Sequence, residues 1–178
     1  MSEETARHDS KVLETERLIL RRLDAEDAGF ILRLVNEPSW LQNIGDRGVR
    51  TLEDAEEYLR SGPLEMYTRL GFGLFLVERK EDGVPIGLCG FLKRPTLDDV
   101  DIGFAFLPQY WGKGYGLESA SAAISWGRRA CGFTRILAIT APHNKASSRL
   151  LRRLDFELEG RVPLDAQELD LYASRPAV

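Results

Sequence analysis

The sequence predicts a single mixed α/β domain with a largely antiparallel central sheet and helices on both faces. A chain of 178 residues can bury one core but is too short for two comfortable domains. Three consecutive strand-like runs in its middle indicate an antiparallel meander, and strands then alternate with helices. No internal repeat or low-complexity segment calls for a second domain.

The first part of the chain carries clear helix-start signals. We expect the polar residues 1–12 to form a flexible tail and residues 13–178 to form the folded domain. Asp24 precedes one helix, and Thr51-Leu-Glu-Asp54 is a capping box with aspartate in the last position. Pro38 ends the first helix, because a residue before proline avoids helical geometry. The predicted elements are a strand over 17–23, a helix over 28–36 and a helix from 51 towards 69.

The remaining elements follow from apolar spacing and turn signals. Asp82-Gly83 between two apolar runs indicates a hairpin. In the helix after the glycine-rich loop, one face is predicted to be buried, and it carries Leu117, Ala120, Ile124, Gly127 and Cys131. The predicted strands cover 71–77, 84–93, 100–107, 135–140, 156–161 and 168–174, and the predicted helices cover 117–130 and 145–154.

Composition excludes several classes of function. The formal net charge of −4 argues against nucleic-acid binding, which requires clustered positive charge. Neither a membrane-spanning apolar run nor a signal peptide is evident, so we expect a cytoplasmic protein without membrane association. The two cysteines, Cys89 and Cys131, and the two histidines are too scattered for a disulfide framework or a metal site.

The segment Gln109-Tyr-Trp-Gly-Lys-Gly-Tyr-Gly116 lies between a predicted strand and a predicted helix. Its three glycines allow consecutive N–H groups to turn towards one centre, and the helix N-terminus adds further donors. Such a loop suits a phosphate or pyrophosphate, with Lys113 as an added charge.

Other interpretations of this loop are weaker. A P-loop requires serine or threonine after its lysine, whereas Gly114 follows Lys113. A dinucleotide fingerprint requires GxGxxG in a parallel βαβ unit, and this GxGxG follows an antiparallel meander. A glycine-rich turn without any ligand remains the plain alternative.

Four ordered motifs resemble one family. Gln109, Gly112 and Gly114 match the Q/R-x-x-G-x-G/A signature of the GNAT N-acetyltransferase superfamily. The other three resemble its RimJ/RimL-type branch, and they lie at Thr15–Arg21, Asn144–Phe156 and Leu169–Ala173. Asp155 departs from the glycine usual there, but aspartate tolerates a left-handed or turn conformation better than most residues.

The resemblance implies a GNAT-like fold, acetyl-CoA as co-substrate without a metal, and direct transfer to a primary amine. The main chain of the strand before the loop would pair with the pantetheine amides. Asn144 would bond the pantetheine arm or a water, or simply cap the following helix. The implied acyl-CoA contacts are Phe104, Ala105, Phe106, Gln109, Trp111, Gly112, Lys113, Gly114, Tyr115, Gly116, Asn144 and Ser147.

The catalytic assignments also come from the resemblance. Position 151 is leucine where many members have a tyrosine acid, so we expect Ser147 to donate to the leaving thiolate. Tyr115 and Tyr172 are alternatives, and a helix-surface role for Ser147 remains open.

Asp101 is the expected base, although the acidic run 98–101 also fits a solvated strand edge. Glu168 and Asp165 are alternatives, because the branch's glutamate is absent near Ala166.

The acceptor is less constrained than the donor. An α-amine, with a pKa of about 7.7–8.0, is easier to deprotonate than a lysine amine by roughly 3–4 kcal/mol. A site without an evident strong base therefore favours a protein N-terminal α-amine. Acetylation of a small-molecule amine and a non-catalytic role as an acyl-CoA-binding module remain alternatives. The protein is expected to be a monomer or a homodimer. An exposed Trp40 and the loop 45–48 are expected on the acceptor side.

Overall fold

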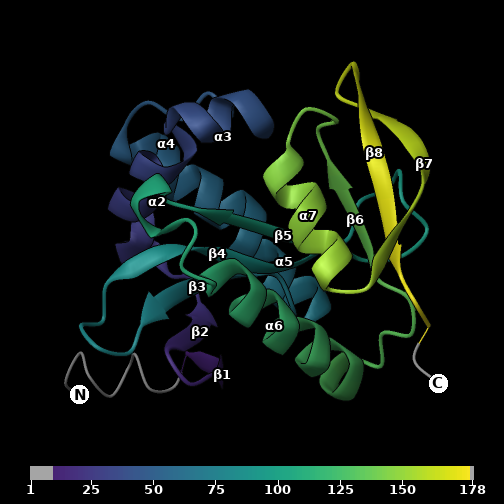
Figure 1. Ribbon diagram of the computed structural model, residues 1–178. Helices are drawn as coiled ribbons and strands as arrows, with labels where there is room; N and C mark the ends of the chain where they lie inside the picture. Colours follow the sequence, from purple (N-terminus) through teal and green to yellow (C-terminus); the bar gives the residue numbers. More distant parts are fainter. Residues whose placement is uncertain (1–9, 177–178) are drawn as a thin grey trace.

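The computed structural model describes residues 10–176, and its centre is one eight-stranded sheet (Figure 1). β5 and β6 run parallel, and all other neighbouring strands are antiparallel. This confirms the predicted mixed α/β fold with a largely antiparallel sheet. In sheet order the strands are β1 (Lys11–Glu14), β2 (Leu18–Arg22), β3 (Leu74–Arg79), β4 (Pro85–Leu92), β5 (Asp101–Phe106), β6 (Leu137–Thr140), β8 (Gln167–Ser174) and β7 (Phe156–Leu164).

Helices cover both faces of the sheet. The long helix α6 packs across β1, β2, β4 and β5, while α7 packs against β6 and β7 (Figure 1). The N-terminal helices cover the opposite face. The α-helices are α2 (Ala28–Val35), α3 (Pro38–Asn43), α4 (Leu52–Leu59), α5 (Glu65–Leu70), α6 (Tyr115–Cys131) and α7 (Lys145–Arg153). The short elements are η1 (Ala25–Asp27), the π-helical η2 (Arg60–Leu64) and η3 (Pro108–Tyr110).

Local signals identified most elements, including both capping boxes. Asp24 and Thr51 each cap a helix through the side chain, with Asp27 and Asp54 reciprocating. Asp155 has φ +60°, the left-handed conformation expected for the residue that replaces glycine. These features depend on a few neighbouring residues and are therefore visible in the sequence.

Several details differ from the prediction, among them the strand expected over 71–77, which is β3 at Leu74–Arg79. Lys11 and Val12 belong to β1 rather than to the predicted tail, whose residues 1–9 lie outside the described residues. The helix expected from Thr51 is divided into α4, η2 and α5, because Pro63 cannot donate a helical hydrogen bond. The six-residue α3 was not predicted. The buried face of α6 is displaced slightly from the predicted one, and it consists of Tyr115, Ser119, Ala120, Ala123 and Gly127.

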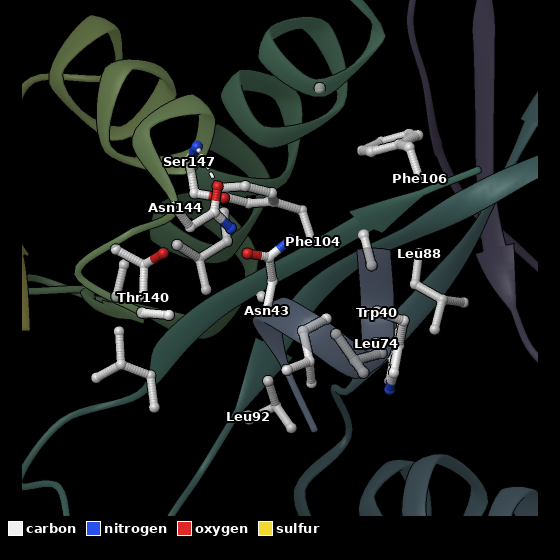
Figure 2. Close-up of a pocket in the computed structure, with 18 of the residues that line it drawn as sticks. Trp40, Asn43, Leu74, Leu88, Leu92, Phe104, Phe106, Thr140, Asn144 and Ser147 are labelled. Atoms are coloured by element: carbon white, nitrogen blue, oxygen red, sulfur yellow. Dashed lines mark hydrogen bonds between the residues drawn. The ribbon is translucent and has the colours of Figure 1, made fainter. Parts of the chain in front are cut away.

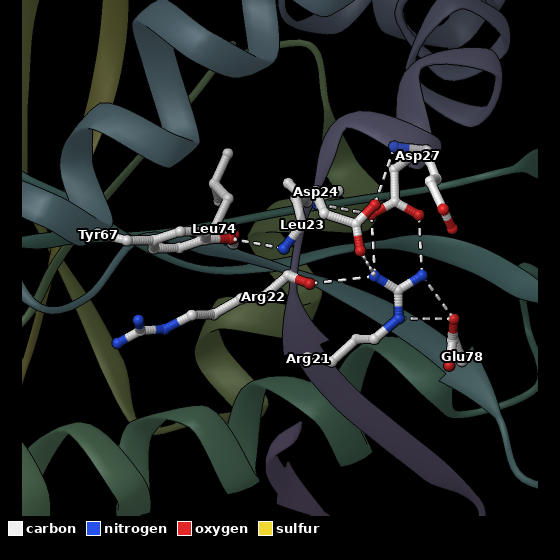
Figure 3. A network of polar contacts seen from close by, with 9 residues as sticks. Arg21, Arg22, Leu23, Asp24, Asp27, Tyr67, Leu74 and Glu78 are labelled. Atoms are coloured by element: carbon white, nitrogen blue, oxygen red, sulfur yellow. Dashed lines mark hydrogen bonds and ion pairs between the residues drawn. The ribbon is translucent and has the colours of Figure 1, made fainter. Parts of the chain in front are cut away.

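A buried polar network joins β2 to its neighbours (Figure 3). Arg21 is 4% exposed, and its guanidinium donates to both carboxylate oxygens of Asp27 at 2.8 and 2.9 Å. Its Nε also donates to Glu78 on β3 at 2.8 Å. Nearby, the Tyr67 hydroxyl accepts from the Leu23 N–H at 3.1 Å. These contacts tie β2 to η1 and β3, and they tie the residue that follows β2 to α5.

Candidate active site

A cavity of about 960 Å³ lies where β5 and β6 separate. Its walls come from α3, β5, the glycine-rich loop, α7 and the β7–β8 turn, which are distant in the sequence. Figure 2 shows Phe104 close to Ser147 on one side and Trp40, Leu74 and Leu92 on the other. A hollow of this size accommodates a large organic ligand.

β5 and β6 begin as parallel neighbours and then diverge. Asp101 is in register with Leu137, whose N–H donates to the Val100 carbonyl at 2.8 Å. β5 stays paired with β4 as far as Phe106, opposite Gly87, whereas no further register pair joins it to β6 in the described part of the chain. One main-chain edge of β5 therefore borders the cavity and offers N–H and C=O groups to an extended ligand.

The glycine-rich loop connects β5 to α6 at the rim of the cavity. Gly112 and Gly114 have φ +71° and +84°, which glycine adopts without steric penalty. Gly114 is the N-cap of α6, and its carbonyl accepts from the Glu118 N–H at 3.0 Å. The N–H groups ahead of Glu118 lie at the positive end of a 17-residue helix. The loop thus has the donors and the dipole that an anion requires.

Residues from the N-terminal strands hold this end of α6 in place. Arg17 Nε donates to Glu118 at 2.7 Å, Arg17 Nη1 donates to the Lys113 carbonyl at 3.0 Å, and the guanidinium lies 4.6 Å from the Tyr115 ring centre. Thr15 donates to the other Glu118 oxygen at 2.5 Å. Burial acts to raise the pKa of Glu118, but the bonds from Thr15 and Arg17 outweigh it and hold the pKa below its usual value. The ionised Glu118 therefore anchors the loop.

Asn144 and Ser147 lie at the start of α7 and line the cavity (Figure 2). Asn144 Oδ1 accepts from the Ser147 N–H at 3.1 Å, so Asn144 does cap the helix. The cap uses only the oxygen and leaves the amide nitrogen without a partner among residues 10–176. Ser147 is half-buried, whereas the next residue, Ser148, donates its hydroxyl to the Asn144 carbonyl at 3.2 Å and lines a different hollow.

Asp101 lies at the narrow end of the gap between β5 and β6. It is 1% exposed and lines the cavity, so it is not on the solvated edge that its acidic neighbours suggested. Arg94 Nε lies 3.1 Å from both carboxylate oxygens. Burial raises the pKa of Asp101, and the positive charge of Arg94 opposes this without cancelling it. A buried carboxylate of raised pKa beside a cavity is a candidate for a functional group.

The sequence predicted some of the residues that line the cavity near α3 and missed others. Trp40 is 6% exposed rather than exposed, and its Nε1 is buried without a partner among the described residues. Arg47, in the predicted acceptor loop, does line the cavity, together with Tyr58 on α4 and Arg94 after β4. Pro38 at the first position of α3 was the signal that could have revealed this helix. No local pattern marks Tyr58 or Arg94.

The remaining candidates are divided between cavity and surface. Most of the expected acyl-CoA contacts line the cavity, as does the alternative base Asp165. Gln109 is exposed on η3, and Lys113 Nζ lies 5.6 Å from the Tyr110 ring centre. Tyr172 is buried in β8, and Glu168 is exposed there. The cavity-lining candidates are Asp101, Phe104, Ala105, Phe106, Trp111, Gly112, Gly114, Tyr115, Gly116, Asn144 and Ser147.

Two kinds of feature are absent from the described residues. Within residues 10–176 we find no helix whose length and apolar character would let it span a membrane. Over the same residues, no group of three or more histidine, cysteine, aspartate or glutamate side chains is placed to hold a metal ion.

Comparison with known sequences decides the family. The profile of the acetyltransferase (GNAT) domain matches residues 17–157, which include the loop, β5 and α7. The chain belongs to the GNAT acetyltransferase family. It is therefore an acyl-CoA-dependent N-acyltransferase, and its acetyltransferase relatives agree with the RimJ/RimL-type branch.

Individual relatives are moderately similar to this GNAT protein. The N-acetyltransferase YoaA of Bacillus subtilis is 29% identical over 150 residues, with 84% of each chain covered. The ribosomal protein uS5-alanine N-acetyltransferase of Escherichia coli is 38% identical over 91 residues, covering 50% of this chain and 45% of that one. A structure of RimL, the ribosomal L7/L12 α-N-protein acetyltransferase, in complex with coenzyme A superposes with TM-score 0.79. It is 20% identical and covers 93% and 98% of the two chains, which demonstrates the shared fold.

The residues present suit an acyl-CoA. The open edge of β5 provides main-chain partners for an extended amide-containing arm, and the α6 N-terminus provides donors for a pyrophosphate. Side chains at two glycines would fill part of the space beside the loop. An added Cβ at Gly114 would lie 3.3 Å from Arg17 Nη2, and one at Gly116 would lie 3.2 Å from Leu150 Cδ2.

Proposed function

We propose that this GNAT protein transfers an acetyl group from acetyl-CoA directly to a protein N-terminal α-amine. The observation that carries the proposal is the continuous cavity that joins the α6 N-terminus, the open edge of β5, Ser147 and the buried Asp101. The pyrophosphate would bind at Gly112–Gly116 and the pantetheine arm along Phe104–Phe106. The thioester would then lie between α7 and Asp101.

In the proposed step the amine attacks the thioester carbonyl carbon, the new N–C bond forms, and the C–S bond breaks. Asp101 accepts the proton that the amine loses, directly or through a water. Ser147 donates a hydrogen bond to the sulfur as it becomes a thiolate, and the thiolate finally takes up a proton. The raised pKa of Asp101 supports its role, because a base works best when its pKa approaches the working pH.

The α-amine is favoured over a lysine amine on energetic grounds. A single buried aspartate already held by Arg94 is a modest base, and an α-amine requires roughly 3–4 kcal/mol less for deprotonation than lysine. The names of two relatives, which act on ribosomal-protein alanine and on the L7/L12 α-amine, support the same acceptor class. The alternatives are a small-molecule amine and a non-catalytic acyl-CoA-binding protein.

One assay separates these possibilities. The protein is incubated with acetyl-CoA and a panel of N-terminal peptides, N-terminally blocked lysine peptides and small amines, and free thiol is followed. We expect thiol release with unblocked peptides and little with blocked lysine peptides. Release with small amines alone would favour a small-molecule enzyme, and no release despite acetyl-CoA binding would favour a binding protein.

A further inference from the structure

Three donor side chains from separate elements line the cavity on the side of the N-terminal helices and β4. Arg47 follows α3, Tyr58 belongs to α4, and Arg94 follows β4, and all three line the cavity together with Asp101. They are distant in the sequence, so the fold rather than a local motif brings them together. Their common property is the ability to donate hydrogen bonds to an anion.

Asp46 and Asp101, the acidic residues beside these donors, accept hydrogen bonds from few of them. Asp46 is held by Arg50, with Nη1 and Oδ1 3.0 Å apart. Asp101 takes only the Nε of Arg94. Within residues 10–176 neither the two terminal nitrogens of Arg94 nor the guanidinium of Arg47 has a hydrogen-bonded or ion-paired acceptor. Two cationic groups that border the cavity are thus available to a ligand.

Tyr58 completes the set with a neutral donor. Its side chain is half-buried, and its hydroxyl has no hydrogen-bond partner in the described chain. Burial raises the pKa of Tyr58, while the nearby charges of Arg47 and Arg94 act in the opposite direction. The phenol therefore stays protonated at neutral pH, and it lines the same cavity as the two guanidinium groups.

The position of these donors defines where an anion would lie on the acceptor. Arg94 already contacts Asp101, the proposed base, so a carboxylate bound to its other nitrogens lies within a few bonds of the reacting amine. The negative charge of such a carboxylate would also offset the positive charge of Arg94. The pKa of Asp101 would then rise further, which makes Asp101 a stronger base. Guanidinium and phenol donors suit a carboxylate, which only accepts.

We propose that Arg47, Tyr58 and Arg94 form an anion subsite that selects peptide N-termini with an acidic residue at the first or second position. This specificity rests on the proposed transfer to an α-amine. It goes beyond that proposal by naming the side-chain chemistry of the acceptor.

The test compares peptides that differ only at the second residue, Ser-Glu, Ser-Gln and Ser-Lys, by their kcat/KM values. We expect Ser-Glu to exceed Ser-Gln by about tenfold or more, as a hydrogen bond between charged groups implies. Arg47→Gln should reduce this ratio towards one, and Tyr58→Phe should reduce it in part. Arg60→Gln is the matched control, because Arg60 carries the same charge, is exposed, pairs with Glu57 and does not line the cavity. A Glu/Gln ratio near one in the wild type, or a preference for Ser-Lys, would overturn the subsite.

A binding measurement separates this proposal from the proposed function. Calorimetry with CoA-loaded protein compares the Ser-Glu and Ser-Gln peptides without turnover. Tighter, Arg47-dependent binding of Ser-Glu by a protein that acetylates no peptide would overturn the proposed function and support the subsite. Acetylation of free glutamate or aspartate in preference to every acidic peptide would overturn the peptide as the source of the carboxylate.

Discussion

The Nε atom of Arg94 lies 3.1 Å from both carboxylate oxygens of Asp101, at the point where β5 and β6 begin to separate. The pair is almost entirely buried on the Asp101 side, with the aspartate side chain 1% exposed and that of the arginine 25% exposed. A carboxylate in this position is shielded from water, and the charge of Arg94 compensates only part of the cost of burying it. Burial and the Arg94 contact therefore act in opposite directions on the pKa of Asp101, and burial has the larger effect.

Replacing Asp101 should reveal its role through the pH dependence of the reaction. Because burial raises the pKa of Asp101, the wild-type kcat/KM should rise with pH through a value above the ordinary carboxyl range, as the proton is lost. Asp101→Asn should lower kcat by about 10²–10⁴-fold and remove this limb. The measurement is a pH–rate profile with an acetyl-CoA titration, whose Kd should not change.

The matched control for this variant is Asp99→Asn. Asp99 lies on the same acidic run but pairs with Arg135 at 2.9 Å and does not line the cavity. Its replacement should leave both the rate and the pH profile intact. An Asp101→Asn protein with a wild-type profile would transfer the role of base to Asp165 or to water.

Local chemistry explains which parts were predictable from the sequence. The capping box at Thr51, the left-handed Asp155 and the glycine-rich loop each depend on a few adjacent residues, and all were identified. Contacts that neither a local pattern nor the family resemblance marks were not identified. Arg94 and Tyr58 acquire their place in the cavity only when β4 and α4 pack around it, and the buried state of Trp40 depends on the short α3.

Ser147→Ala should lower turnover while leaving acetyl-CoA affinity nearly unchanged. The hydroxyl is proposed to donate to a thiolate that exists only as the C–S bond breaks, so its loss acts on the transition state. The expected decrease in kcat is about 10–100-fold, the effect of one hydrogen bond to a charged group. Ser148→Ala is the control, since Ser148 donates to the Asn144 carbonyl away from the cavity. Equal rates for wild type and Ser147→Ala would exclude Ser147 from the mechanism.

Gly114→Val should abolish acetyl-CoA binding. Gly114 has φ +84°, which a β-branched residue adopts only with strain, and an added Cβ would lie 3.3 Å from Arg17 Nη2. The loop would have to move, and its N–H groups would no longer converge. Gly132→Val provides a control for strain alone, because Gly132 caps the other end of α6 at φ +70° with no atom near its Cβ position. Calorimetry with acetyl-CoA should detect binding in the Gly132 variant; retained affinity in Gly114→Val would remove the loop from the cofactor site.

Arg21→Ala should destabilise the fold by about 3–5 kcal/mol, because it leaves the buried carboxylates of Asp27 and Glu78 without their shared cation (Figure 3). The adjacent Arg22 is exposed and lies 5.2 Å from the Tyr67 ring centre, so Arg22→Ala should cost about 1 kcal/mol or less. Urea unfolding followed by circular dichroism measures both free energies. Arg21→Lys keeps the positive charge and should therefore recover part of the lost stability. The recovery should be incomplete, since an ammonium group cannot donate in the planar fork that Asp27 and Glu78 accept. A loss below about 1 kcal/mol for Arg21→Ala would mean that water enters the network and replaces the guanidinium.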